Sequence, residues 1–121
     1  MNIDQIRDHC LSKKAALEDF PFDQDTLVFK VMGKMFVIAP LEKWECGEAT
    51  ITLKCDPDYT TELRDSYESI YAGPYVSNKH WNTIAIYKNE LSPQFVLQLI
   101  DHSYEMVVKG MTKKQREALN S

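Results

Sequence analysis

The sequence predicts an α+β domain in two layers, with helices on one face of an antiparallel sheet and the order α-β-β-β-α-β-β-α. Two runs rich in β-branched and aromatic residues, 27–32 and 35–39, flank a short turn at Gly33, which is typical of a β-hairpin. Residues 49–55 alternate apolar and polar side chains, as a half-buried strand does. The segment 93–109 repeats apolar residues at helical spacing. Together these patterns favour a sheet with helices packed beside it.

The chain is expected to begin with a helix and a short strand. Asn2 can cap the helix, since Gln5 follows at the spacing of a capping box, and the helix is expected to end near Lys14. The strand is expected over 17–22. Pro21 inside it favours an edge position or an irregular end, because proline cannot donate a ladder hydrogen bond.

In the hairpin that follows, alternation predicts which side chains share a face. Leu27, Phe29 and Val31 are expected on one face, with Lys30 on the other. Pro40 is expected to end the second strand of the hairpin.

A charged connection over 42–48 comes next, and its Trp44 has no periodic partner. After the strand 49–55, Asp56 and Pro57 supply the N-cap and first-turn proline of a helix that should run to about Tyr67.

The last third is expected to hold two strands and two helices. Residues 71–75 resemble a loop, a strand is expected over 83–87, and the fifth strand, if present, lies within the poorly patterned stretch 70–78. The longest helix should end at Gly110, and a short final helix should start at Thr112, again with capping-box spacing.

Length and composition predict one domain, 1–121, in the cytoplasm. Apolar residues make up 44% and charged residues 26%, as in ordinary globular proteins. Apolar runs stay far below the roughly 18 residues of a membrane span. The first residues lack the basic and apolar regions of a signal peptide. Neither CxxC nor HxxxH spacing occurs, so we expect no metal site, no cofactor and reduced, structural cysteines.

The formal net charge is −4, and the acids are concentrated in two segments. Residues 1–26 and 41–69 are acidic, whereas 27–40 and 70–121 are slightly basic. A continuous basic stripe, which general polyanion binding requires, is not visible.

Five stretches, in chain order, carry a family resemblance: 27–31 with 33–36, 53–57, 78–83, 99–104, and 107–108 followed by 113–114. In these stretches the chain resembles the MmcQ/YjbR family of small bacterial proteins. The resemblance implies a fold similar to secretion chaperones, with Trp81, Asn82, Ser103 and Tyr104 as a structural signature. It also implies DNA binding, since the sheet and hairpins of the family are similar to a "double wing" arrangement in a phage transcription factor.

The pentapeptide Asn78-Lys79-His80-Trp81-Asn82 surrounds one large aromatic residue with polar residues at the entrance to a strand. Trp81 is expected to be largely buried, with a polar neighbour accepting its indole N–H. Two alternatives are that the segment lines a binding surface and that His80 acts as a general base or stacks on a nucleic-acid base.

The sequence predicts no catalytic residues. Asp101, His102 and Ser103 are consecutive on a helix, so their side chains point about 100° apart and cannot converge on one atom. Cys46 and Cys55 lack the local signature of a nucleophile. The remaining candidates are solvated carboxylate pairs and isolated turn glycines: Glu45 with Glu48, Asp56 with Asp58, Gly33 and Gly73.

Two functions therefore remain, both without catalysis and both expected of a monomer. The first is a regulatory or accessory protein that binds DNA weakly through the outer sheet face and the hairpin. Its candidate contacts are Lys30, Lys34, Lys54, Lys79, His80 and Lys88. The alternative is a chaperone-like module that holds a protein partner on the sheet face or on an exposed strand edge.

Overall fold

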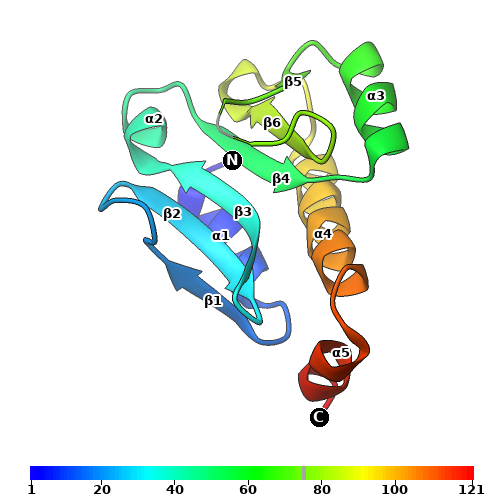
Figure 1. The fold of residues 1–121 in the computed structure, drawn as a ribbon. Helices are drawn as coiled ribbons and strands as arrows, with labels where there is room; N and C mark the ends of the chain where they lie inside the picture. Colours follow the sequence, from blue (N-terminus) through cyan, green and yellow to red (C-terminus); the bar gives the residue numbers. More distant parts are fainter. Residues whose placement is uncertain (75) are drawn as a thin grey trace.

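Six antiparallel strands form one sheet in the order β1-β2-β3-β4-β6-β5 in the computed structural model, which describes residues 1–74 and 76–121 (Figure 1). The strands are β1 (Ala16–Asp19), β2 (Thr26–Val31), β3 (Lys34–Pro40), β4 (Thr50–Lys54), β5 (Ile70–Tyr71) and β6 (Trp81–Ala85). The helices are α1 (Ile3–Leu11), α2 (Leu41–Glu45), α3 (Pro57–Ser66), α4 (Pro93–Lys109) and α5 (Lys113–Leu119), with one 3-10 turn, η1 (Ile86–Lys88). The predicted α+β class is confirmed. The described sheet has one strand more than the predicted order, because the short edge segment also pairs, as β1.

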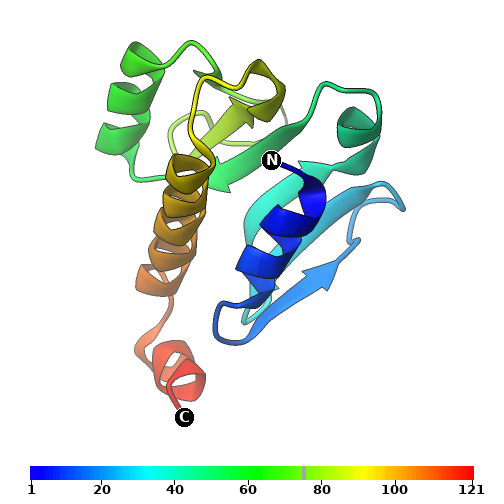
Figure 2. The same cartoon turned by 180° about the vertical axis from the view of Figure 1, so that it is seen from behind.

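The helices α1 and α4 cover one face of the sheet, and Figure 2 shows both in front of the strands. The core lies between these layers and includes Ile6 and Cys10 of α1, Phe29 and Ile51 of the sheet, and Ile100 of α4, all fully buried. The helix α3 stands beside β5, and α5 lies beyond the end of α4 (Figure 1). The opposite face of the sheet, in front in Figure 1, is called the outer face below.

The capping box at Asn2 forms as predicted. The Asn2 side chain accepts the Gln5 N–H at 2.9 Å, and the Gln5 side chain accepts the Asn2 N–H at 2.8 Å. The helix α1 ends at Leu11, earlier than the predicted Lys14, because the chain turns back towards β1 through Ala15, whose φ is +60°. The hairpin turn also differs by one residue, since Met32 and Gly33 both have positive φ, the geometry that matches the twist of two-residue hairpins.

The helix α2 is not predicted from the sequence. It is only five residues long, and no side chain caps it. Leu41 and Trp44, spaced three residues apart on this helix, pack against the core, and the Trp44 indole N–H donates to the Thr50 carbonyl at 3.0 Å. Tertiary burial of these two side chains, rather than local propensity, therefore stabilises the turn.

The second half follows the predicted signals with small shifts. Asp56 caps α3 by accepting the N–H groups of Asp58 and Tyr59. The fifth strand is the short β5 within 70–78, and Tyr75 of the predicted loop lies outside the described residues. The strand β6 begins two residues before the predicted 83–87 and ends at Ala85, where the chain enters η1.

Ser103 joins α4 to the sheet at a point where two strands diverge. The strands β3 and β4 pair only at Val37–Leu53 and Ile38–Thr52. Beyond this pairing, the fully buried Ser103 hydroxyl donates to the Phe36 carbonyl at 2.6 Å and accepts the Lys54 N–H at 2.9 Å. One hydroxyl therefore satisfies two backbone groups that strand pairing leaves free.

Tyr104, the next residue, connects α4 to the turn after α1. Its hydroxyl donates to the Lys14 carbonyl at 2.6 Å, and its ring contacts Phe36 edge-on with centroids 5.3 Å apart. The Ser103–Tyr104 pair thus fixes α4 against both β3 and the chain after α1.

Candidate interaction surface

Strand register identifies the side chains of the outer face. Residues directly opposite each other in antiparallel strands share a face. One row crosses the whole sheet: Asp19, Val28, Ile38, Thr52, Thr83 and Tyr71. A second row joins Leu17, Lys30 and Met35. The outer face is therefore largely apolar over β2 and β3 and polar over β4 and β6.

The chain itself covers part of the polar half. Thr52 and Thr83 share a hydrogen bond of 2.9 Å between their hydroxyls. A Cβ at Gly73 would lie only 2.0 Å from the Thr83 hydroxyl, so the segment after β5 lies directly on this pair and requires glycine there. Thr83 is accordingly buried, and this part of the predicted binding face is closed to a partner.

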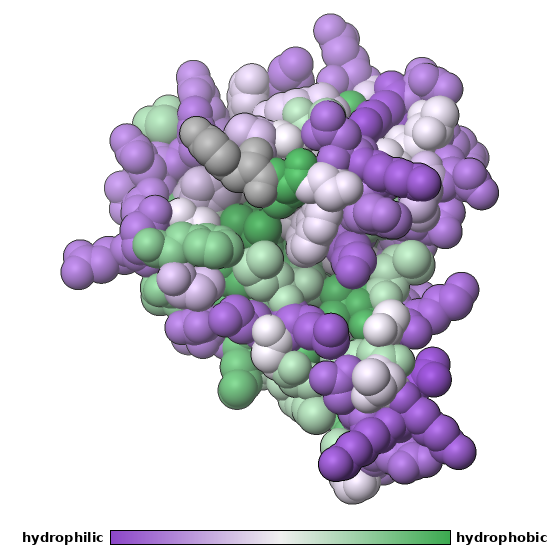
Figure 3. Space-filling view, in the orientation of Figure 1, coloured by the Kyte–Doolittle hydropathy of each residue, from purple (hydrophilic) through white to green (hydrophobic). Residues whose placement is uncertain are grey.

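The apolar half remains open at its edge. Leu17 is 70% exposed, Phe20 44% and Phe22 62%, and these three residues are called the apolar edge. They belong to β1 and the segment just after it. Figure 3 shows hydrophobic side chains gathered on the outer face over this half, with hydrophilic ones running between them. Several large apolar side chains exposed within six residues of one sheet edge favour contact with a partner.

Lys30, a predicted DNA contact, is neutralised on this half of the face. Its ammonium lies 3.1 Å from the Asp19 carboxylate on the neighbouring strand, and its side chain is only 25% exposed. The ammonium hydrogen bond and a second one from the Phe20 N–H hold the pKa of Asp19 below its usual range. Lys30 is thus already occupied by an intramolecular partner.

Three other predicted contacts meet at one end of the sheet, called the basic end: Lys54, Lys79 and His80. Register places Lys54 opposite Trp81, and the His80 carbonyl accepts the Cys55 N–H at 2.8 Å. Lys79 and His80 are exposed. Among the described residues, neither Lys54 nor Lys79 has an acidic side chain at ion-pair distance.

The other predicted lysines do not join this group. Lys34 is exposed at the start of β3, beside the hairpin turn. Lys88 lies in η1, past the far end of β6. The predicted set is therefore spread over several places rather than along one continuous positive face.

Arg64, which the sequence patterns do not single out, positions the pentapeptide. Its guanidinium donates to the Asn82 side-chain oxygen at 2.7 Å and to the carbonyls of Asn78 at 2.6 Å and Trp81 at 2.9 Å. One planar cation from α3 thus holds both ends of the segment. Asn82 is 3% exposed, and its amide nitrogen has no partner among the described residues.

Trp81 opens strand β6, and most of its side chain is buried, as expected. It lies on the outer face, however, outside the core between sheet and helices. Trp44 is the tryptophan that packs on this core and has its indole N–H hydrogen-bonded. The alternation of β6 directs Asn82 and Ile84 towards the helices instead.

The consecutive polar residues of α4 contact three different places. Asp101 pairs with His9 at 2.7 Å and Lys13 at 2.5 Å, both from the N-terminal part of the chain. The His102 ring nitrogen accepts the Asp56 N–H at 3.2 Å. The Ser103 hydroxyl is hydrogen-bonded to the sheet. The side chains of Asp101, His102 and Ser103 therefore contact different groups, as their helical spacing predicts.

The thiols and carboxylates also have structural neighbours. Burial raises the pKa of the Cys10 thiol to about 12, and burial likewise raises that of Cys55. Glu48 lies 3.8 Å from Lys43.

Within residues 1–74 and 76–121, no three His, Cys, Asp or Glu side chains lie close enough to hold a metal ion. None of the described helices combines the length and the apolar character that a bilayer crossing requires.

Comparisons with known proteins agree on one family. The family model described as YjbR matches residues 11–106. The uncharacterized protein YbdF of Escherichia coli O157:H7 is 32% identical over 116 residues, which cover 90% of this chain and 91% of YbdF.

Two solved structures have the same fold. The crystal structure of Deinococcus radiodurans protein DR2400, described as a DUF419 domain, is 33% identical with a TM-score of 0.87 and covers 98% of this chain and 88% of its own. A Pseudomonas syringae protein is 25% identical with a TM-score of 0.70, covering 88% of this chain and 98% of its own.

Proposed function

The chain belongs to the YjbR family, and from this premise we propose that it is a non-catalytic protein-interaction module that binds an extended partner segment along β1. The observation that carries the proposal is the apolar edge: Leu17, Phe20 and Phe22 are exposed beside a strand that pairs on one side only, with β2. In this proposal the protein binds its partner as a monomer. Cys10, Cys46 and Cys55 are all free thiols, which fits action in the cytoplasm.

Binding by strand addition would use both the unpaired backbone groups of the edge strand β1 and the exposed side chains of the apolar edge. An edge strand presents unpaired N–H and C=O groups, which an extended peptide can pair with, while pockets or patches for alternate side chains give specificity. Most edge strands are protected by charges or by a covering segment. Here Leu17, the member of the apolar edge that lies within β1 itself, is the most exposed large hydrophobic residue among those described.

Charge defines the chemistry of the partner. Residues 18–25 contain four acids and no base: Glu18, Asp19, Asp23 and Asp25. Arg7 pairs with Glu18 at 2.7 Å and Lys30 with Asp19, which leaves Asp23 and Asp25 without a basic partner among the described residues. The partner should therefore be an extended segment that alternates apolar residues with lysine or arginine.

A display library of random peptides tests this proposal. Selected sequences should alternate apolar and basic residues, and Leu17→Ser should weaken their binding by about fivefold or more, as for a central apolar contact. Leu11→Ser, which removes an exposed leucine of α1, should leave binding unchanged. Selected peptides that bind the Leu17→Ser and Phe22→Ser variants as tightly as the parent would contradict the proposal.

DNA binding is the second candidate, and one observation favours it. Lys54, Lys79 and His80 come together at the basic end through the pairing of β4 with β6. A few phosphate contacts of this kind support only weak, salt-sensitive association. Binding of duplex DNA that disappears when Lys54 and Lys79 are both changed to Gln would support this second function.

A further inference from the structure

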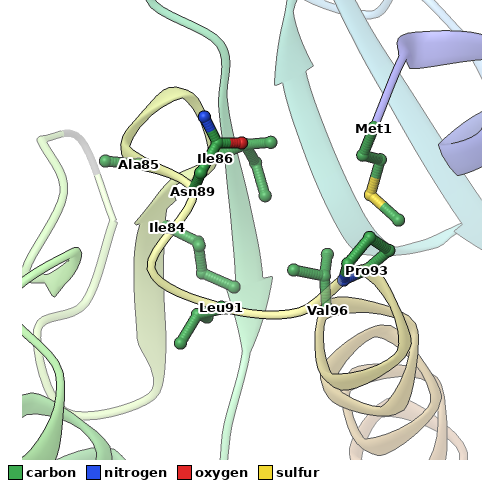
Figure 4. A pocket seen from close by; sticks show the side chains of 8 residues that line it. All are labelled: Met1, Ile84, Ala85, Ile86, Asn89, Leu91, Pro93 and Val96. Atoms are coloured by element: carbon green, nitrogen blue, oxygen red, sulfur yellow. The ribbon is translucent and has the colours of Figure 1, made fainter.

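The two ends of the molecule expose different side chains. Near the end where α1 begins, a cavity of about 30 Å³ is lined mainly by apolar side chains, such as Ile84, Leu91 and Val96, and by no lysine or arginine (Figure 4). At the opposite end lie the turn after α1, the β2–β3 hairpin turn, the end of α4 and the helix α5 (Figure 1). This opposite end is called the α5 tip below.

Six exposed cations lie at the α5 tip, and none of them has an acidic side chain at ion-pair distance among the described residues. Glu105 on α4 and Glu117 on α5 are exposed acids nearby, and the cations outnumber them. The acidic segment 41–69, which includes α2 and α3, lies towards the other end (Figure 1). One end is therefore positive although the net charge is −4. The six cations are Lys14, Lys34, Lys109, Lys113, Lys114 and Arg116.

Backbone contacts fix three of these segments relative to one another. Ala16 pairs with Val31, and Val31 pairs with Lys34, so the turn after α1 and the hairpin turn lie at the same level of the sheet. The Tyr104 hydroxyl donates to the Lys14 carbonyl at 2.6 Å, which connects the turn after α1 to the second half of α4. The cations of these segments therefore share one end of a rigid fold.

The helix α5 is fixed as well, although it is only seven residues long. Met111, just before it, and Leu119, its last residue, are both buried and belong to the core. Thr112 caps its first turn. In Figure 3 hydrophilic side chains gather over this helix, at the lower end of the view. The cations of α5 are thus held on a packed helix rather than on a free tail.

The hairpin turn adds an exposed apolar side chain to the α5 tip. Met32 and Gly33 both have positive φ, where asparagine, aspartate or glycine is usual. Met32 is 39% exposed and does not belong to the core, so neither turn geometry nor core packing requires a methionine here. Leu11, at the end of α1, is a second exposed apolar side chain at this end. Both side chains are available to an apolar environment.

We propose that the α5 tip binds the surface of a bilayer that contains anionic lipids, with Met32 inserted between the headgroups and the six cations beside lipid phosphate groups. An anionic leaflet attracts each nearby lysine or arginine. The acids of 41–69 oppose this attraction little, because charges are screened beyond a Debye length of about 8–10 Å. A small apolar contact together with a cluster of cations is the combination that holds a protein reversibly on such a surface.

The exposed apolar side chains favour a bilayer over a soluble polyanion. A nucleic acid or an acidic polypeptide would account for the cations, but it offers no apolar layer to Met32 and Leu11. Binding at the surface also requires no segment that crosses the membrane. The proposal does not depend on the peptide site at β1.

The test is sedimentation of the full chain with vesicles of phosphatidylcholine alone and with vesicles that also contain phosphatidylglycerol. The protein should bind the anionic vesicles and not the neutral ones, and added salt should weaken binding. The tip variant, with Lys109→Gln, Lys113→Gln and Lys114→Gln, should bind about 100-fold more weakly, since each lysine near an anionic surface contributes about fivefold.

A control variant with the same net charge locates the surface. It carries Lys54→Gln, Lys79→Gln and Lys88→Gln, which lie outside the α5 tip. It should bind the anionic vesicles much more tightly than the tip variant does. Circular dichroism of both variants checks that the fold is kept.

Met32→Asn tests the apolar contact separately from stability. Asparagine is favoured at a turn residue with positive φ, so this change should not lower the free energy of unfolding, yet it should weaken vesicle binding several-fold. Phe22→Ser removes an exposed apolar side chain of the apolar edge and should leave vesicle binding unchanged.

Three results would overturn the proposal. The first is equal binding to neutral and anionic vesicles. The second is an equal loss in the tip variant and the control variant, or unchanged vesicle binding of Met32→Asn. The third is binding of duplex DNA or polyglutamate that the tip variant loses while anionic vesicles do not bind, which would make the α5 tip a site for a soluble polyanion.

Discussion

The ammonium of Lys30 lies 3.1 Å from the carboxylate of Asp19 across the β1–β2 pair, on the outer face of the sheet. The alternation of β2 places Lys30 on the outer face, where it was expected to contact DNA. The ion pair with Asp19 neutralises this lysine, so it is not available to a phosphate group. The pair also leaves the neighbouring Leu17 and the two following phenylalanines as the exposed features of this edge. The surface is therefore better suited to an apolar, basic polypeptide than to phosphate groups.

Lys30 should not contribute to any DNA binding. Lys30→Gln should leave affinity for a random-sequence duplex unchanged at low salt, whereas Lys54→Gln with Lys79→Gln should reduce it. With only a few phosphate contacts, log affinity should fall with log salt by about 0.9 for each contact, and the dissociation constant should not be below roughly 10⁻⁶ M at physiological salt. Fluorescence anisotropy at two salt concentrations measures both quantities. Nanomolar binding, or a strong effect of Lys30→Gln, would contradict this prediction.

Ser103→Ala should destabilise the fold by about 1–3 kcal/mol, because it leaves the buried Phe36 carbonyl and Lys54 N–H without their shared partner. Urea unfolding gives the difference. Ser77→Ala, at an exposed position, serves as the control and should change the free energy of unfolding by less than about 0.5 kcal/mol. Equal effects of the two substitutions would show that Ser103 does not join α4 to the sheet.

Arg64→Ala should destabilise the start of β6, with a loss of about 2–3 kcal/mol expected for a cation that donates three hydrogen bonds. Amide hydrogen exchange should quicken at 78–82 more than in β2. Arg116→Ala, on α5, is the matched control. Unchanged protection at 78–82 would rule out Arg64 as the residue that positions this segment.

Trp44 and Trp81 should respond differently to the same change. Trp44→Phe removes the hydrogen bond to the Thr50 carbonyl and should cost about 1 kcal/mol or more. Trp81→Phe removes no described hydrogen bond and should cost less. A larger loss for Trp81→Phe than for Trp44→Phe in urea unfolding would contradict this prediction.

The Asp101 contacts predict a pH dependence. Burial alone would raise the pKa of Asp101, but its hydrogen bonds with Lys13 and His9 outweigh that effect and hold the pKa below its usual range. A depressed folded-state pKa contributes stability above the unfolded-state pKa of about 3.9, and this contribution is lost as the pH falls through the folded-state value. The stability advantage of the parent over Asp101→Asn should therefore be constant at neutral pH and shrink below about pH 4. An advantage that persists unchanged to pH 2 would contradict it.

Most of the fold can be predicted from local signals, and the deviations have physical causes. The predicted caps at Asn2, Asp56 and Thr112 all form, because each depends only on residues a few positions away. The helix α2 is not predicted because it has no local sequence signal. The packing of Leu41 and Trp44 against the core stabilises it. The position of Trp81 on the outer face is not predicted, because the face of β6 that meets the helices is decided by pairing with β4, not by residue size.

The candidate sites were harder to predict for a similar reason. Charge alone could not show that Lys30 has a partner on the neighbouring strand or that Gly73 brings a segment over the threonine pair. Arg64 carries no periodic or motif signal, although its contacts connect residues far apart in the chain.

The most direct test of the central claim is a backbone amide titration of the ¹⁵N-labelled protein. The ligands are a short peptide that alternates valine and lysine and, in a parallel sample, a random-sequence DNA duplex. The peptide is expected to shift the amides of 16–20 and Phe22 at lower concentrations than the duplex needs to shift any signal, with little change at Lys54, Lys79 and His80. Shifts confined to those three residues, produced by DNA and not by the peptide, would contradict the claim that the apolar edge is the interaction surface.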